Sequence, residues 1–171
     1  MPPSRPPSDE ELDRAARRLG RRLTDRGWQV AAAESCTGGL VGHVITQVPK
    51  SSDHFLGGIV SYSNAAKEEL LDVPGDLLER AGAVSSEVAE AMTTGALARF
   101  PVAHLAVAVT GIAGPDGGSD DKPVGLTYVA AALRDGRAIV ERYEWPHDRD
   151  GNKRASVLAA LELADRLARE G

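Results

Sequence analysis

The stretch LAVAVTGIAGPDGGSDDKPVGLTYVAAAL, Leu105 to Leu133, contains the features that decide the fold. It begins with a continuous apolar run from Leu105 to Val109, which has the length of a strand buried on both faces. A glycine-rich loop follows from Gly111 to Pro123, and a second strand is predicted from Leu126 to Leu133. A long loop directly after a buried strand is a candidate for function.

Further strands are predicted on both sides of this stretch. Asp135-Gly136 is a strong signal for a hairpin turn, so a strand is predicted over Ala138–Tyr143. This strand runs antiparallel to the one before it. Towards the N-terminus, short apolar runs predict strands over Trp28–Ala33 and Ile59–Tyr62.

Helices are predicted between the strands from the helical spacing of apolar residues. The first opens with a capping box, in which Ser8 and Glu11 each meet a free backbone N–H, and it ends at Gly27. The other helices are predicted over Leu40–Ile45, from a cap at Asn64 through Leu71, around Leu77, from Ser85 or Ser86 through Leu97, and over Asn152–Arg169.

The order α-β-α-β-α-α-β-β-β-α predicts an α/β protein with a mostly parallel sheet covered by helices on both faces. The hairpin adds one antiparallel strand, so the sheet is mixed. A chain of 171 residues of which 42% are hydrophobic buries one core, and we expect a single domain over residues 9–171. The proline-rich residues 1–8 are expected to be a disordered tail.

Composition and charge exclude several classes of protein. No apolar run approaches the roughly 18 residues of a membrane-spanning helix, and the N-terminus lacks the apolar region of a secretory signal. A net charge of −5 does not favour nucleic acid as a partner. The single cysteine excludes an internal disulfide, and the four histidines have no metal-ligand spacing. We therefore expect a cytoplasmic protein without metal or other cofactor.

The segment Glu34-Ser35-Cys36-Thr37-Gly38-Gly39 follows a predicted buried strand and precedes a helix. In an open α/β sheet, ligands bind beyond the carboxyl ends of the strands, and the start of a helix favours negative charge. Ser35 is therefore a candidate nucleophile, with the alternative that Ser35 and Thr37 only cap the next helix. Cys36 is a second candidate nucleophile, with the alternative that it is a small packed residue.

Lys67 lies in the first turn of the helix after the second predicted strand. The helix dipole disfavours a cation at this end, and with desolvation it favours a neutral amine, the form that a general base requires. The alternative is an ordinary solvated surface lysine.

The glycine-rich loop and Arg149 are candidates for binding an anion. Successive N–H groups of such a loop can point at a phosphate or carboxylate, although the loop lacks the ending of a P-loop. Arg149 can hold a phosphate with two hydrogen bonds. The alternatives are a flexible surface loop and a surface ion pair.

Five segments together resemble one family: AAAESCTGG, GGIVSYSNAAKEELL, GAVSSEVAEAM, AVAVTGIAGPDGGS and KPVGLTYVA. They occur in the order and spacing of the CinA C-terminal-domain family, and the resemblance covers residues 9 to 169. This family includes the nicotinamide-nucleotide amidohydrolases (NMN deamidases of the PncC type). The resemblance implies a three-layer α/β/α sandwich with a mixed sheet of about five strands, and we expect the stand-alone form, without the separate N-terminal domain of full-length CinA proteins.

The resemblance also implies an activity and its residues. The activity is hydrolysis of the carboxamide of nicotinamide mononucleotide (NMN) to nicotinate mononucleotide and ammonia, in pyridine nucleotide recycling, by a serine and a lysine without metal. We expect a small-molecule substrate and a homo-oligomer. The implied catalytic residues are Ser35, Lys67 and Tyr62, and the expected substrate-binding residues are Thr37, Gly38, Ser52, Thr110, Gly111, Gly114 and Arg149.

Two positions depart from the family pattern, because Lys50 and His147 stand where the family usually has glycine. From the residues alone, N–H groups near the Thr37–Gly38 turn are expected to hold the oxyanion of the reaction. Two other functions remain open: an enzyme that uses Cys36 as nucleophile with Lys67 as its base, and a non-catalytic module that binds a nucleotide or a partner.

Overall fold

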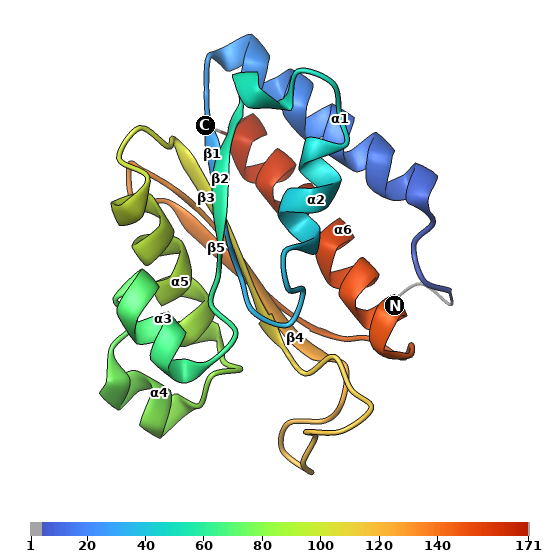
Figure 1. Ribbon diagram of the computed structural model, residues 1–171, viewed down its shortest axis with the longest axis vertical. Helices are drawn as coiled ribbons and strands as arrows, with labels where there is room; N and C mark the ends of the chain where they lie inside the picture. Colours follow the sequence, from blue (N-terminus) through green and yellow to red (C-terminus); the bar gives the residue numbers. More distant parts are fainter. Residues whose placement is uncertain (1–4, 171) are drawn as a thin grey trace.

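The computed structural model describes residues 5–170, which form an α/β fold around one five-stranded sheet (Figure 1). The strand order is β2-β1-β3-β4-β5. Strands β2, β1 and β3 are parallel, whereas β4 is antiparallel to both of its neighbours. The mixed, mostly parallel sheet that the sequence predicts is therefore confirmed. The strands are β1 (Val30–Glu34), β2 (Phe55–Val60), β3 (Leu105–Gly111), β4 (Leu126–Leu133) and β5 (Ala138–Glu144).

Helices cover both faces of the sheet and complete a three-layer arrangement (Figure 1). One layer contains α1, α2 and α6, and the other contains α3, α4 and α5. None of the helices described between residues 5 and 170 is long and apolar enough to cross a membrane. The helices are α1 (Asp9–Arg26), α2 (Leu40–Thr46), α3 (Asn64–Leu71), α4 (Gly75–Ala81), α5 (Ser86–Arg99) and α6 (Arg149–Glu170), with a 3₁₀ turn η1 (Ser51–Asp53).

The ends of α1 are those that the sequence predicts. The side chain of Ser8 accepts a hydrogen bond from the N–H of Glu11, whose carboxylate in turn accepts from the N–H of Ser8. Gly27 ends the helix with a φ of 65°, a left-handed conformation that glycine adopts without steric cost.

Several predicted boundaries are wrong. β2 begins at Phe55 and ends at Val60, where the sequence predicts Ile59–Tyr62. It is an edge strand that contains two glycines and is only partly buried, so no continuous apolar run marks it. β1 ends at Glu34 rather than Ala33, because its pairing with β3 extends to that residue. α3 is capped by Ser63 and not by Asn64, since the Ser63 hydroxyl accepts from the N–H of Ala66.

The expected tail, residues 1–8, is partly described. Residues 1–4 lie outside the described residues. Arg5 pairs with Glu11, Pro7 is buried, and the Pro7 carbonyl accepts a hydrogen bond of 2.7 Å from Arg154 of α6. Residues 5–8 are thus held against α1 and α6.

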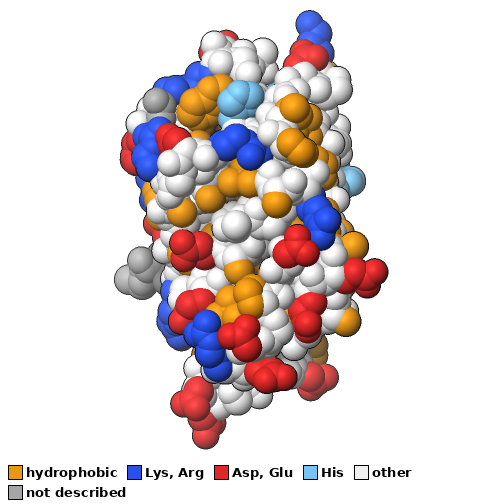
Figure 2. All heavy atoms as spheres, turned by 90° about the vertical axis from the view of Figure 1, so that its left-hand side faces the viewer, with side chains coloured by type: hydrophobic (Ala, Val, Ile, Leu, Met, Phe, Trp, Pro, Cys, Tyr) orange, Lys and Arg blue, Asp and Glu red, His pale blue; other side chains and the backbone are white. Residues whose placement is uncertain are grey.

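The sheet divides the core into two clusters. β1 contributes Val30 and Ala32 to the cluster under α1, α2 and α6, and Ala33 to the cluster under α3, α4 and α5. This alternation follows from the two-residue period of a strand. The outer face of α3 and α4 is acidic (Figure 2), because Glu68 and Glu69 point to solvent while the lysine of α3, Lys67, is buried.

Candidate active site

Strands β1, β2 and β3 are parallel and finish at the same end of the sheet (Figure 1). Ser35 and Lys67 follow two of these strands and contact each other. Ser35 is the first residue after β1, and its N–H donates to the carbonyl of Val109 in β3. Lys67 lies in the first turn of α3, which follows β2. The Nζ atom of Lys67 is 2.9 Å from the Oγ atom of Ser35. Two of the three candidate catalytic residues are therefore in hydrogen-bond contact, although 32 positions separate them.

The surroundings of Lys67 favour its neutral form. The side chain is buried, with 1% of its surface exposed. Its other partner is the carbonyl of Ser61, which accepts from Nζ at 2.8 Å. No carboxylate forms a salt bridge with it among residues 5–170. Burial lowers the pKa of the Lys67 amine below its ordinary value, so the alternative of a solvated surface lysine is wrong.

Glu34 supports the site, and sequence reasoning assigned no role to it. Its carboxylate is buried and accepts from four donors: the hydroxyl of Thr37 at 2.6 Å and the N–H groups of Gly39, Val41 and Gly42 at 2.9–3.1 Å. These bonds hold the turn that carries Ser35. An acidic residue at the end of an apolar strand, directly before a glycine-containing turn, is the signal that marks it in the sequence.

The hydrogen bonds of this turn correct two expectations. The Thr37 hydroxyl donates to Glu34, so Thr37 is a structural residue of the turn and does not line the cleft. The N–H of Gly38 donates to the carbonyl of Ser35, so it is not free to hold an oxyanion. By contrast, the N–H of Cys36 makes no hydrogen bond with another residue of the described range 5–170.

A cleft of about 250 Å³ opens beside the Ser35–Lys67 pair. Seven of the ten predicted site residues line it, together with residues of the glycine-rich loop and of the turn between α4 and α5. The seven are Ser35, Tyr62, Lys67, Thr110, Gly111, Gly114 and Arg149.

Arg149 and Tyr62 meet across the mouth of this cleft. Arg149 is the first residue of α6, and its guanidinium donates to the carbonyl of Gly114 at 2.6 Å and to the hydroxyl of Tyr62 at 3.1 Å. Tyr62 is 60% exposed, and its hydroxyl contacts Arg149, not Ser35 or Lys67. The arrangement places a cation and a phenol at the border of the cleft.

The glycine-rich loop has free donors. Gly114, Asp116 and Gly117 are among the residues that line the cleft. Their backbone N–H groups make no hydrogen bond with another of the described residues. Asn152 fixes the base of this loop, because its buried side-chain amide donates to the carbonyl of Ala113. Sequence reasoning assigned no role to Asn152.

Cys36 is not placed for nucleophilic chemistry. It is buried in the core cluster under α2 and α6, although it also borders the cleft. Burial raises the pKa of its thiol to about 12, so the thiolate is not populated near neutral pH. The alternative of a small packed residue describes it better.

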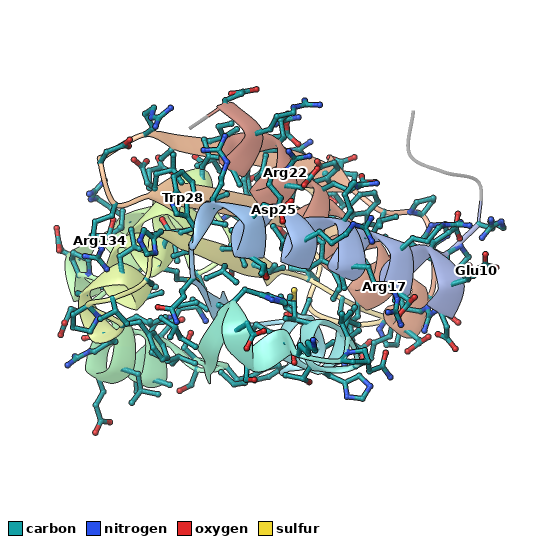
Figure 3. All side chains as sticks on the ribbon, turned by 90° about the horizontal axis from the view of Figure 1, so that it is seen from above. Glu10, Arg17, Arg22, Asp25, Trp28 and Arg134 are labelled. Carbon is teal, nitrogen blue, oxygen red and sulfur yellow. The ribbon has the colours of Figure 1, made fainter. Side chains whose placement is uncertain are left out.

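Ser52 lies away from the cleft. It belongs to η1, before the start of β2, whereas Ser35 lies beyond the end of the neighbouring parallel strand. A six-residue strand spans about 17 Å, so the two serines of this chain lie at opposite ends of the sheet. The neighbouring Lys50 lines a different cavity, of about 280 Å³, to which α1 contributes Arg17 and Asp25 (Figure 3).

His147 also lies outside the cleft. It lines an adjoining cavity of about 410 Å³, which shares Ala113 and Arg149 with the cleft. The backbone N–H of His147 donates to the side-chain oxygen of Asn152. No group of three or more histidine, cysteine, aspartate or glutamate residues that could hold a metal ion occurs within residues 5–170.

Comparison with solved structures supports the fold. The crystal structure of competence/damage inducible protein CihA from Agrobacterium tumefaciens is similar over 96% of this chain and 99% of that chain, with a TM-score of 0.88 and 40% sequence identity. The CinA superfamily protein KP700603 from Klebsiella pneumoniae is similar with a TM-score of 0.89 and 29% identity, over 94% and 99% of the two chains.

Comparison of sequences places the chain among curated proteins. A CinA-like protein of Geobacter sulfurreducens is 49% identical over 90% of this chain, which spans only 36% of that relative's length. Nicotinamide-nucleotide amidohydrolase PncC of Enterobacter agglomerans is 43% identical over 92% of this chain and 95% of its own. Residues 12–168 match the family described as the CinA C-terminal domain. The chain therefore belongs to the CinA C-terminal domain family.

Proposed function

We propose that the chain hydrolyses the carboxamide of nicotinamide mononucleotide to nicotinate mononucleotide and ammonia, as a step in pyridine nucleotide recycling. The observation that carries the proposal is the buried contact of 2.9 Å between Ser35 Oγ and Lys67 Nζ, beside a cleft and without a carboxylate partner for the amine. A relative with 43% identity carries the name of this activity.

The geometry supports a Ser/Lys mechanism. The neutral amine of Lys67 takes the proton of the Ser35 hydroxyl as Oγ attacks the carboxamide carbon. The tetrahedral intermediate collapses, and the nitrogen leaves as ammonia with the proton that Lys67 returns. A water molecule then attacks the ester of Ser35, again with Lys67 as the base, and releases nicotinate mononucleotide. The carbonyl of Ser61, which accepts from Nζ, holds the amine in place throughout.

The negative charge on the carbonyl oxygen requires donors. The N–H of Cys36, the residue directly after Ser35, is free among the described residues and takes this role in the proposal. This donor replaces the N–H of Gly38, which is bonded to the carbonyl of Ser35.

The phosphate of the substrate is assigned to Arg149 and the free N–H groups of the glycine-rich loop. A charge-assisted contact of this kind contributes about 1.5–3 kcal/mol. Arg149→Ala should therefore lower kcat/KM for NMN by roughly tenfold to a hundredfold, while the rate with nicotinamide riboside, which lacks the phosphate, changes little. Equal losses with both substrates would place the phosphate elsewhere.

The test of the function is incubation of the protein with NMN and measurement of ammonia and nicotinate mononucleotide in equal amounts. Ser35→Ala is the matched control, because it removes one hydroxyl at the cleft. Binding of NMN without release of ammonia would replace the proposal by a non-catalytic nucleotide-binding module. The absence of both NMN binding and NMN hydrolysis would refute the proposal.

A further inference from the structure

The turn between α4 and α5 forms one wall of the cleft. Ala83 and Val84 of this turn line the cleft with small apolar side chains. A second wall is the glycine-rich loop, which includes Gly114 and Gly117. The two walls belong to segments that are distant in sequence.

Two side chains outside the turn hold its carbonyl groups. The ammonium of Lys122, near the end of the glycine-rich loop, donates to the carbonyl of Ala81 at 2.6 Å and to that of Val84 at 2.9 Å. The hydroxyl of Thr110, at the end of β3, donates to the carbonyl of Ala83 at 2.7 Å. Three carbonyl groups of four successive residues are thus bound, two by the glycine-rich loop and one by the end of β3.

The absence of a side chain at Gly82 leaves room for the end of the Lys122 side chain. A Cβ atom on Gly82 would lie 2.7 Å from the Lys122 Nζ atom, closer than such atoms approach. The φ of Gly82 is +76°, in the left-handed region that favours glycine. Among the described residues Lys122 forms no salt bridge with a carboxylate, so the carbonyl groups are its partners.

We propose that Lys122 is a positioning residue for the substrate of the proposed reaction. It joins the glycine-rich loop to the turn at Ala81–Val84, with Thr110 as a second, weaker link. The joined walls hold the pyridine ring between Val84 and the loop and keep the loop N–H groups directed at the phosphate. The inference rests on the proposed function for its substrate, but the link between the walls is a property of the chain alone.

Arg134 provides a matched control. Its guanidinium also binds three carbonyl groups, those of Leu97, Phe100 and Ala103, at 2.6–2.9 Å. It lines a cavity between α5 and the β4–β5 hairpin, outside the cleft. Figure 3 shows it at the side of the molecule near α5. Arg134→Met therefore removes a similar cation–carbonyl link without touching the two walls.

The kinetic test compares Lys122→Met with Arg134→Met on NMN. Hydrogen bonds from charged groups are strong enough that their loss should raise KM by about tenfold for Lys122→Met, with kcat within about threefold. Arg134→Met should leave both constants within about twofold. Thr110→Val should raise KM by about threefold, and Thr110→Ser, which keeps the hydroxyl, should restore it. A KM unchanged by Lys122→Met, or raised equally by Arg134→Met, would overturn the proposal.

Amide hydrogen exchange tests the link without substrate. Lys122→Met should accelerate exchange in residues 81–86 and 112–125 together, whereas Arg134→Met should leave these segments unchanged. If the wild-type protein did not hydrolyse NMN, the proposed function would fail, and the exchange result would still decide whether Lys122 joins the walls. Unchanged exchange in both segments of a folded Lys122→Met protein would refute the link.

Discussion

Glu34 and Lys67 are two buried charged residues at the same end of the sheet, and their surroundings differ sharply. The Glu34 carboxylate accepts hydrogen bonds from four donors that belong to its own turn and to the start of α2. The Lys67 amine has a hydroxyl and a carbonyl as partners and no carboxylate. The carboxylate of Glu34 is thus surrounded by hydrogen-bond donors, whereas the amine of Lys67 has no partner of opposite charge among the described residues.

The difference separates the structural role of Glu34 from the catalytic role that we propose for Lys67. Burial of a charge is costly unless hydrogen bonds or an opposite charge compensate it. The donors around Glu34 compensate a negative charge, so the residue stabilises the turn that holds Ser35. Lys67 lacks such compensation, and its pKa falls, which makes the amine available as a base.

The largest expected effect is on the Ser35–Lys67 pair. Ser35→Ala and Lys67→Met should each lower kcat for NMN by roughly 10⁴-fold, and the double variant should be little worse than either, because residues that act as a unit are not additive. Steady-state kinetics with the three variants, checked by circular dichroism, measure this. Losses that multiply in the double variant would show that the two residues act independently.

The next effect concerns Glu34. Glu34→Gln keeps the size of the side chain but turns one acceptor oxygen into an NH₂ group that faces backbone donors, so it should destabilise the fold by about 2–4 kcal/mol. Urea unfolding measures the change. Glu69→Gln, at an exposed position of α3, is the control and should stay within about 0.5 kcal/mol. Equal losses in the free energy of unfolding for the two variants would mean that the buried hydrogen bonds of Glu34 do not stabilise the fold.

The pH dependence of stability tests the contrast between Glu34 and Lys67 further. Since the pKa of Lys67 is lower in the folded protein than in the unfolded chain, the unfolded chain binds the extra proton at pH values between the two. Stability therefore rises with pH across this window, by at most about 1.4 kcal/mol per pH unit, and is lost as the pH falls. Lys67→Met should lack this slope and be more stable than wild type below the window.

The same shift predicts the acid side of the activity profile. The kcat/KM for NMN should rise with pH as Lys67 loses its proton, with a midpoint below the ordinary lysine pKa of 10.5. Thermal unfolding over a pH series tests the predicted stability slope, and kinetics over the same series test the predicted rise in kcat/KM. An identical stability slope in Lys67→Met would show that another group is responsible.

The smallest effect is expected at Cys36. Cys36→Ala should retain most of the activity, because its thiol has a raised pKa and the backbone N–H that we propose as the oxyanion donor remains. A modest loss of stability, about 1 kcal/mol, should follow from the small cavity in the core. Loss of activity in Cys36→Ala, together with an active Ser35→Ala protein, would transfer the role of nucleophile to Cys36.

Local patterns predicted most of the fold because the physics that they reflect is local. The capping box at Ser8, the left-handed Gly27 and the Asp135-Gly136 hairpin each depend on a few neighbouring residues. The boundaries of β2 could not be predicted in this way. An edge strand with glycines in its centre has no apolar run, and its length is set by pairing with β1.

The candidate site was predictable in its residue types but not in its geometry. Spacing and motif identified Ser35, Lys67 and Arg149, and all three line one cleft. The same reasoning placed Ser52 in the pocket and assigned Thr37 to the substrate, because a motif carries no information about which end of a strand or which side of a turn a residue occupies.

The sequence by itself determined the order of helices and strands, the mixed sheet and the loops that follow its parallel strands, because apolar periodicity and turn residues act over short distances. Only the tertiary structure decided which groups meet. Desolvation and hydrogen bonding depend on the whole surroundings of a side chain. The sequence placed Glu34 at the end of a strand and Lys67 in the first turn of a helix, and the fold alone provided four donors for Glu34 and left the amine of Lys67 beside Ser35.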